Sequence, residues 1–195
     1  MSTVLEPRSA GGQRILTVAD LAVLPADIPS GSVKYELGDG RLVLMAPPGD
    51  DHSIVQNRAG VVLFLHGEKR GLGKSRSEVG VILRRNPDRV VGPDAAFIAN
   101  RSLPVRTSPE GYLETIPELV VEVRSKNDTL PELRDKVAEY LAAGVQIVWV
   151  VDPRSKMVTV FRPGQDSCEL RMGDVLTAEG AIPGFQAPVA ELFDL

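Results

Sequence analysis

The sequence predicts an α/β domain in which helices flank a central mixed β-sheet. Strand-like runs of apolar residues are interspersed with two segments whose apolar residues recur at helical spacing. In addition, residues 119–151 read as a strand, a helix and a second strand, an arrangement that normally forms a parallel pair with a right-handed crossover. The expected core order is therefore helix, three strands, helix, strand.

The N-terminal part is expected to contain a tail, a short helix and a hairpin. Residues 1–14 lack periodicity and predict a flexible tail, so that residues 15–195 form a single domain. Thr17 can cap a short helix that runs to Leu24, just before a proline. The segments VKYEL and RLVLM predict a hairpin, because the intervening GDG tolerates the positive φ of a tight turn.

A first long helix is expected from about Asp50 to Arg70. The acidic pair at its start favours a helix N-terminus, and Gly71 is a typical terminator. Its apolar residues fall largely on one side, which predicts a face packed against the sheet. These residues are Ile54, Val55, Val61, Val62 and Leu65.

The rest of the core is predicted from three strands, a second long helix and two further strands. The three strands are expected at 78–83, 94–98 and 119–124, with a proline-containing loop at 99–118. The helix is expected from Leu130 to Ala143, capped by Asp128 or Thr129 and ended by Gly144. Its apolar stripe consists of Leu133, Val137, Tyr140 and Leu141. Residues 146–151 predict a strand covered on both faces, and 157–161 an alternating one; a last strand and irregular segments complete the chain.

Composition excludes several classes of protein. At 195 residues and 43% hydrophobic, the chain is long enough for one substantial core. A single cysteine, Cys168, excludes an internal disulfide, and two histidines are too few for a Cys/His zinc cluster. No apolar run approaches the roughly 20 residues that span a bilayer, and no secretory signal opens the chain. We expect a soluble, cytoplasmic protein without a membrane partner.

The charge pattern argues against a protein that coats nucleic acid. The net charge is −4, whereas bulk neutralisation of phosphates needs a concentrated cationic surface. Locally, cations exceed anions between His66 and Val90. The cations are Lys69, Arg70, Lys74, Arg76, Arg84, Arg85 and Arg89, and the anions are Glu68, Glu78 and Asp88. This segment is either an ordinary solvated surface or a basic rim beside an acidic catalytic centre.

Two carboxylates are the strongest candidates for chemistry. Glu122 lies inside an apolar strand, where an unpaired charge is costly, so something must compensate it. Asp94 stands at the start of another short apolar strand, and two oxygen ligands of this kind are the usual protein contribution to a magnesium site. The simpler alternatives are that Glu122 pairs with Arg124, another cation or solvent, and that Asp94 is a turn or capping residue.

Two lysines compete for a cationic role near these carboxylates. Lys136 lies at the border of the buried stripe of the second long helix, from which its ammonium can reach over the sheet and neutralise developing charge. Lys126 lies in the loop that follows the strand of Glu122. Both are otherwise explained as ordinary surface lysines.

The chain resembles a known family. Asp94 after Pro93 on one strand and the Glu122-Val123-Arg124 run on the next resemble the PD-(D/E)XK nuclease fold, whose core is a restriction-endonuclease-like αβββαβ unit. YELGDGRLVLMAPPG, GPDAAF, PELVVEVRSKND, LRDKVAEYLAAGVQIVWVVDP and the late PGF resemble, in this order, the Uma-type, DUF820-like restriction endonucleases. The similarity extends from about Tyr35 to Phe193, most of the chain.

The resemblance implies a metal-dependent endonuclease that hydrolyses DNA phosphodiester bonds. Asp94 and Glu122 would bind Mg²⁺ (or Mn²⁺), and Glu36 would be a further acidic member of the site. The broader pattern has a lysine two residues after the glutamate, where this chain has Arg124. Because arginine stays protonated and cannot act as a general base, Lys136 is expected to take the lysine's place.

Three questions stay open at this point. His52 either approaches the site or is simply a polar residue at a helix start. The way such nucleases reach two strands implies a homodimer. The rival interpretations are a nucleic-acid-binding or regulatory module that has lost turnover, favoured by Arg124, and a structural domain whose carboxylates merely pair with Arg124 and Lys136.

Overall fold

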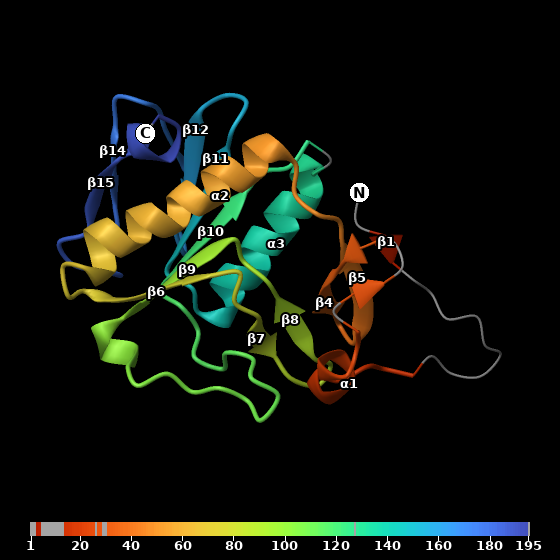
Figure 1. The fold of residues 1–195 in the computed structure, drawn as a ribbon. Coiled ribbons are helices and arrows are strands. Elements are labelled where there is room, and N and C mark those ends of the chain that lie inside the picture. Colours follow the sequence, from red (N-terminus) through yellow and green to blue (C-terminus); the bar gives the residue numbers. More distant parts are fainter. Residues whose placement is uncertain (1–2, 5–13, 26, 29–30, 127, 195) are drawn as a thin grey trace.

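The computed structural model describes residues 3–4, 14–25, 27–28, 31–126 and 128–194. A six-stranded mixed sheet forms the centre, and a five-stranded sheet lies beside it (Figure 1). Three α-helices are described: α1 (Val18–Ala22), α2 (Asp50–Leu63) and α3 (Leu130–Ala143). The fold is thus the expected α/β class with a central mixed sheet and flanking helices.

The central sheet has the strand order β13-β12-β11-β10-β9-β6. Its strands are β6 (Gly73–Ser77), β9 (Ala95–Ala99), β10 (Leu119–Val123), β11 (Ile147–Asp152), β12 (Met157–Phe161) and β13 (Cys168–Leu170). Within this sheet β10 and β11 are the only parallel neighbours, and the other described pairs are antiparallel. Because α3 connects these two strands, the predicted strand-helix-strand unit is confirmed.

The second sheet has the order β1-β5-β4-β8-β7. Its strands are β1 (Thr3–Val4), β4 (Lys34–Gly38), β5 (Arg41–Met45), β7 (Val81–Arg84) and β8 (Arg89–Val91). Two small pairs complete the strands, β2 (Asp27–Ile28) with β3 (Gly31–Ser32) and β14 (Val175–Thr177) with β15 (Gln186–Pro188). Short helical turns lie at Phe64–Glu68, Asn100–Ser102 and Val189–Leu192. None of the described helices is long and apolar enough to span a bilayer.

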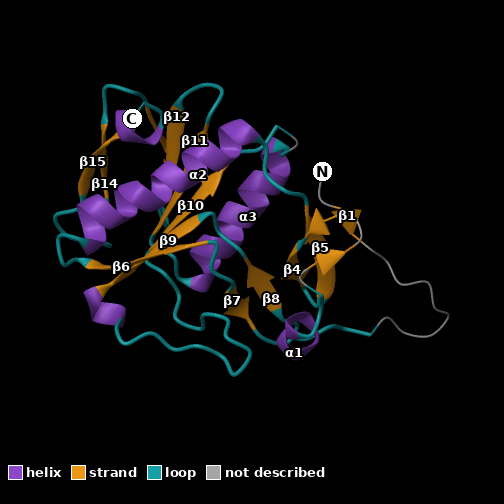
Figure 2. Cartoon of the chain, in the orientation of Figure 1, coloured by secondary structure: helices purple, strands orange, loops and turns teal. Residues whose placement is uncertain are grey.

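The central sheet is buried on both faces, and strand alternation decides which helix each residue meets. Val121 and Trp149 belong to the cluster that packs under α2 and the C-terminal segment. Val120 and Val148 belong to the cluster under α3. Figure 2 shows α2 crossing the sheet, with α3 behind the strands from the same viewpoint. Glu122 follows the alternation of Val120 and therefore faces α3.

The predicted boundaries of α3 are confirmed at both ends. Thr129 caps the helix and forms a reciprocal capping box with Glu132, and Gly144 adopts the left-handed conformation at φ 108°. Capping by Thr129 decides between the two cap candidates. This fixed start matters because it sets which residues of α3 point at the sheet.

The first of the three core strands was predicted at the wrong place. The segment expected at 78–83 forms β7, which belongs to the second sheet and pairs with the unpredicted β8. Its position in the central sheet is taken by β6, an edge strand of sequence GKSRS. A polar edge strand lacks the apolar alternation by which strands are found in a sequence.

The long helix expected at Asp50–Arg70 is interrupted. The regular α-helix α2 ends at Leu63. A π-helical segment follows from Phe64 to Glu68, and the chain leaves the helix at Gly71, whose φ is 74°. Ile54 and Leu65, predicted in the buried stripe, are 42% and 39% exposed. Val55 and Val62 are buried as predicted, and the buried face also includes Gln56, Ala59 and Leu63.

The N-terminal elements agree with the prediction in part. Thr17 caps α1 as expected, although the helix ends at Ala22 rather than Leu24. The β4–β5 hairpin turns through Asp39 and Gly40, both at positive φ. Most of the tail predicted for 1–14 lies outside the described residues, but β1 pairs with β5. A two-residue strand is too short to leave a periodic pattern.

Candidate active site

The centre of the candidate site is Glu122, which lies near the end of β10 and is 8% exposed. Its Oε1 accepts a hydrogen bond from the Tyr140 hydroxyl at 2.5 Å, and its Oε2 accepts one from Lys136 Nζ at 3.0 Å. Lys136 and Tyr140 are four residues apart on α3 and therefore share the helix face that covers Glu122. The compensation that the buried charge requires comes from α3.

Glu36, on β4 of the second sheet, joins the same cluster. Its Oε1 accepts hydrogen bonds from Lys136 Nζ at 3.3 Å and from the backbone N–H of Gly92 at 3.0 Å. Its Oε2 lies 3.4 Å from Arg89 of β8. Lys136 therefore bridges two carboxylates carried by different sheets.

Asp94 precedes β9 and is tied to the backbone of β10. Its Oδ2 accepts a hydrogen bond from the Val123 N–H at 2.7 Å, which holds Asp94 beside the residue that follows Glu122. Its Oδ1 lies 3.1 Å from Nε2 of His52 on α2. Both side chains are 15% exposed, and Lys136 is 19% exposed, so these three members of the cluster are partly open to solvent.

The electrostatics of the cluster are unequal. Burial raises the pKa of Glu122 to about 7; Lys136 opposes this rise, and the charges of Asp94 and Glu36 add to it. Burial also opposes ionisation of Glu36, but Lys136, the Gly92 N–H and Arg89 hold its pKa below the usual value. Burial lowers the pKa of Lys136, yet the charges of Glu122 and Glu36 more than compensate and raise it. Lys136 is therefore a cation at neutral pH.

Residues 20–190 match the family model described as Uma2, putative restriction endonuclease. The chain belongs to the Uma2 family. The match covers most of the chain, including every element that carries the cluster. Comparison with curated proteins gives no match.

The fold of this Uma2 chain is also similar to a solved structure. That structure is the crystal structure, at 1.96 Å resolution, of a putative nuclease belonging to DUF820 from Anabaena variabilis ATCC 29413. The TM-score is 0.71 at 17% sequence identity, and the similarity covers 91% of this chain and 97% of the other. The family match supports a nuclease function with a nucleic acid as its substrate, and the solved structure shows that the fold is shared.

The structure brings together Glu36, Asp94, Glu122, Lys136 and His52, all of which the sequence singled out. Arg124 and Lys126 lie just beyond the end of β10, and within the described residues no hydrogen bond or ion pair joins their side chains to these five. Arg124 pairs at 3.0 Å with Asp152, the last residue of the neighbouring strand β11, rather than with Glu122. Lys126 is exposed in the next loop.

Sequence reasoning missed two residues of the cluster. Tyr140 was assigned only to the apolar stripe of the helix, although its hydroxyl contacts Glu122. Arg89 was counted with the basic segment, yet it is buried and also pairs with Glu139 at 2.7 Å. The spacing of Lys136 and Tyr140 was a usable signal for the tyrosine. The contact of Arg89 depends on β8 pairing with β4, which no local pattern indicates.

The basic segment does not form a continuous cationic rim. Lys74 pairs with Glu68, Arg84 with Asp39, and Arg85 with both Asp88 and Glu114. The ordinary solvated surface is the better description of most of this segment.

The cluster provides oxygen ligands of the kind that divalent cations prefer. Among the described residues, no three His, Cys, Asp or Glu side chains are grouped closely enough to hold a metal by themselves. Magnesium, however, is usually bound by one or two carboxylates, with waters and substrate phosphates completing the shell. Asp94 accepts a hydrogen bond from Val123, the residue after Glu122. Asp94 and Glu122 therefore provide the two carboxylates that a magnesium site usually needs.

Proposed function

We propose that this Uma2 chain is a divalent-metal-dependent endonuclease that hydrolyses DNA phosphodiester bonds, with Asp94 and Glu122 as the metal ligands. One observation carries the proposal. The Val123 N–H holds Asp94 beside the residue that follows Glu122, so two carboxylates are carried by neighbouring segments of the central sheet at the end of β10. The charge of Asp94 acts on Glu122 and contributes to its raised pKa.

The surplus of negative charge supports binding of a cation at this position. Glu122 is buried against one lysine that it shares with Glu36, and Asp94 adds a third carboxylate nearby. The high pKa of Glu122 means that its ionised form is poorly compensated by the protein alone. A bound Mg²⁺ or Mn²⁺ would supply that compensation, polarise a phosphate oxygen and lower the pKa of a coordinated water.

The remaining side chains position the carboxylates and stabilise charge. The Tyr140 hydroxyl orients Glu122, and the His52 imidazole orients Asp94 from its other oxygen. Lys136 remains protonated, so it acts through its charge on the developing negative charge of the phosphate and does not accept a proton. Glu36, anchored by Gly92 and Arg89, holds the ammonium of Lys136 in place.

The test is cleavage of plasmid DNA and of single-stranded DNA with Mg²⁺ or Mn²⁺. Asp94→Asn and Glu122→Gln should each abolish detectable cleavage, because each removes a charged ligand with little change in volume. Asp166→Asn, an exposed position between β12 and β13, is the matched control and should cleave like the wild type. Unchanged cleavage by both site variants would overturn the proposal.

A second candidate function has a specific observation in its favour. Lys136 already forms ion pairs with Glu36 and Glu122, which is the pattern expected if the carboxylates are only structural. In that case the site would not catalyse cleavage, and the alternative function is a module on a nuclease scaffold that binds nucleic acid without turnover. Calorimetry separates the two: Mg²⁺ binding that is lost in Asp94→Asn supports the endonuclease, and DNA binding without any Mg²⁺ binding supports the second candidate.

We further propose that residues 15–195 act as one domain and that the active form is a homodimer. Two active sites are needed to cut both strands of a duplex in one encounter, and two-fold dimers are the commonest way to provide them. Sedimentation at working concentration should show a dimer. A monomer that still cuts both strands at once would exclude the dimer.

A further inference from the structure

A small basic pocket lies just beyond the end of β10. It is lined by Arg124, Ser125, Lys126, Asp152 and Arg154 and has a volume of about 60 Å³. That is about twice the ~30 Å³ that one water molecule occupies in the liquid. The pocket therefore has room for a small oxyanion group.

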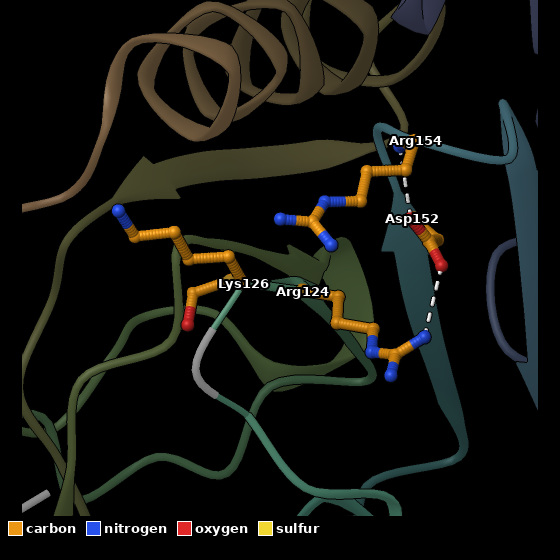
Figure 3. A pocket seen from close by; sticks show the side chains of 5 residues that line it. Arg124, Lys126, Asp152 and Arg154 are labelled. Carbon is orange, nitrogen blue, oxygen red and sulfur yellow. Dashed lines mark hydrogen bonds and ion pairs between the residues drawn. The ribbon is translucent and has the colours of Figure 1, made fainter. Parts of the chain in front are cut away.

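The charges around this pocket are mostly positive and only partly compensated. Among the described residues that line the pocket, Asp152 is the only carboxylate, and it pairs with Arg124 at 3.0 Å. Its other oxygen accepts the backbone N–H groups of Arg154 and Ser155. Within the part of the chain that the structure describes, the ammonium of Lys126 and the guanidinium of Arg154 have no hydrogen-bond or ion-pair partner. Figure 3 shows Arg124 turned toward Asp152, whereas the Lys126 and Arg154 side chains end without such a contact.

The arrangement prepares donors for an anion. Asp152 holds the Arg124 guanidinium through one hydrogen-bonded ion pair, so the other N–H groups of that guanidinium remain available as donors. The second carboxylate oxygen of Asp152 holds the turn at residues 153–155. An arginine fork matches the two non-bridging oxygens of a phosphate, and a second cation nearby strengthens such binding.

The position of the pocket connects it to the candidate site. Arg124 follows directly after Val123, whose N–H holds Asp94, and its own N–H is bonded to Val151 of β11. The loop that carries Lys126 is closed by Asp128, which accepts hydrogen bonds from Ser125. The pocket thus lies at the carboxyl end of the parallel β10–β11 pair, next to the proposed metal ligands.

We propose that this pocket binds a backbone phosphate of the nucleic acid substrate, one that flanks the scissile phosphate and fixes the strand on the enzyme. The inference rests on the proposed nuclease function and adds to it a substrate-positioning subsite with Lys126, Arg124 and Arg154. Lys126 and Arg154 are exposed and unpaired, so their substitution leaves the described contacts of the fold intact.

The experiment measures binding of a short labelled DNA duplex in Ca²⁺, under conditions without turnover, at several salt concentrations. The variants are K126Q, R154Q and the double variant. Arg106→Gln is the matched control, because Arg106 is an exposed arginine in the loop before β10, at the opposite end of that strand. The same proteins are titrated with inorganic phosphate alone.

In the double variant, the slope of log affinity against log salt should decrease in magnitude by about 1, the contribution of one phosphate contact. The Arg106→Gln slope should equal that of the wild type, and inorganic phosphate should show no saturable binding. An unchanged slope overturns the subsite, as does a decrease of about 2, which would indicate two separate phosphate contacts. Saturable binding of inorganic phosphate with an unchanged DNA slope would assign the pocket to a free anion instead.

These outcomes are independent of cleavage. If the slope changes as expected but the wild type does not cleave, the pocket still binds a backbone phosphate, while the endonuclease proposal and the placement beside a scissile phosphate both fail. If the wild type cleaves but the slope is unchanged, the reverse holds.

Discussion

Replacing Glu122 with glutamine should make the protein more stable at alkaline pH while it removes the proposed activity. The pKa of Glu122 rises from an ordinary 4.5 to about 7, chiefly because the side chain is buried. Each tenfold change in proton affinity is worth about 1.4 kcal/mol. Ionised Glu122 therefore lowers the free energy of unfolding by about 3 kcal/mol above pH 7.

The sign follows from proton binding. Between pH 4.5 and about 7 the folded chain keeps a proton on Glu122 that the unfolded chain has lost, so stability falls as the pH rises through this window. Glutamine stays neutral at every pH. Its carbonyl oxygen can accept from Lys136, and its amide can donate to the Tyr140 hydroxyl, which also accepts hydrogen bonds.

The assay is thermal unfolding at pH 4 and pH 8 without divalent cations. For a chain of this length about 1 kcal/mol corresponds to roughly 2–4 °C. Glu122→Gln should therefore melt roughly 6–12 °C above the wild type at pH 8, with little difference at pH 4. Saturating Mg²⁺ should raise the melting temperature of the wild type only, because the variant lacks a charged ligand.

The matched control is Glu118→Gln. Glu118 is equally buried, but it accepts bonds from the Ala99 N–H and the Ser102 hydroxyl and pairs with Arg101. Removing its charge should lower stability at pH 8 by about 1–3 kcal/mol. The reasoning is refuted if Glu122→Gln is no more stable than the wild type at pH 8, or if the two variants behave alike.

Three further predictions concern α3 and β6. Lys136→Gln should lower the rate of DNA cleavage by about 10²–10³-fold with unchanged circular dichroism, because it removes one cation that stabilises negative charge on the phosphate. A cleavage rate within roughly threefold of the wild type would contradict this role of Lys136. Tyr140→Phe should lower the free energy of unfolding by about 1.5–3 kcal/mol in urea titrations, because it removes a hydrogen bond to Glu122. In the control Tyr112→Phe, the free energy of unfolding should stay unchanged, because the Tyr112 hydroxyl has no hydrogen-bond partner among the described residues. Gly73→Ala should cost about 1–3 kcal/mol, because its methyl group would collide with the carbonyl oxygen of Ile98; an unchanged melting temperature would contradict this packing.

The elements that could be predicted from sequence are those in which local signals agree with each other. In α3 a capping threonine, an apolar stripe and a terminal glycine all indicate the same boundaries, and the structure has those boundaries. The buried strand β11 was equally clear, because an uninterrupted apolar run is typical of a strand covered on both faces.

The elements that the sequence did not predict are those for which local signals are missing. β6 is stabilised by pairing with β9 rather than by its own residues, so a polar sequence such as GKSRS gives no indication of a strand. The π-helical turn after Leu63 rotates the following residues away from the predicted face. Such features depend on tertiary contacts that a local pattern does not contain.

The candidate site follows the same division. Asp94 and Glu122 stood out because each is a charge next to an apolar strand, whereas Arg89 contacts Glu36 only because two distant segments pair in the second sheet. The family resemblance drew attention to Glu36, whereas Lys136 stood out from its position at the border of the apolar stripe of α3. Their bridge is nevertheless a property of the fold, since 100 residues separate the two side chains.

The most direct test of the account is a crystal structure of the wild type soaked with Mn²⁺, with the ion located by its anomalous signal. We expect a single strong peak within coordination distance of both Asp94 and Glu122, and no peak there in crystals of Glu122→Gln. A peak bound to neither carboxylate, or none at concentrations that saturate other magnesium-dependent nucleases, would contradict the central claim that these two side chains share one cation.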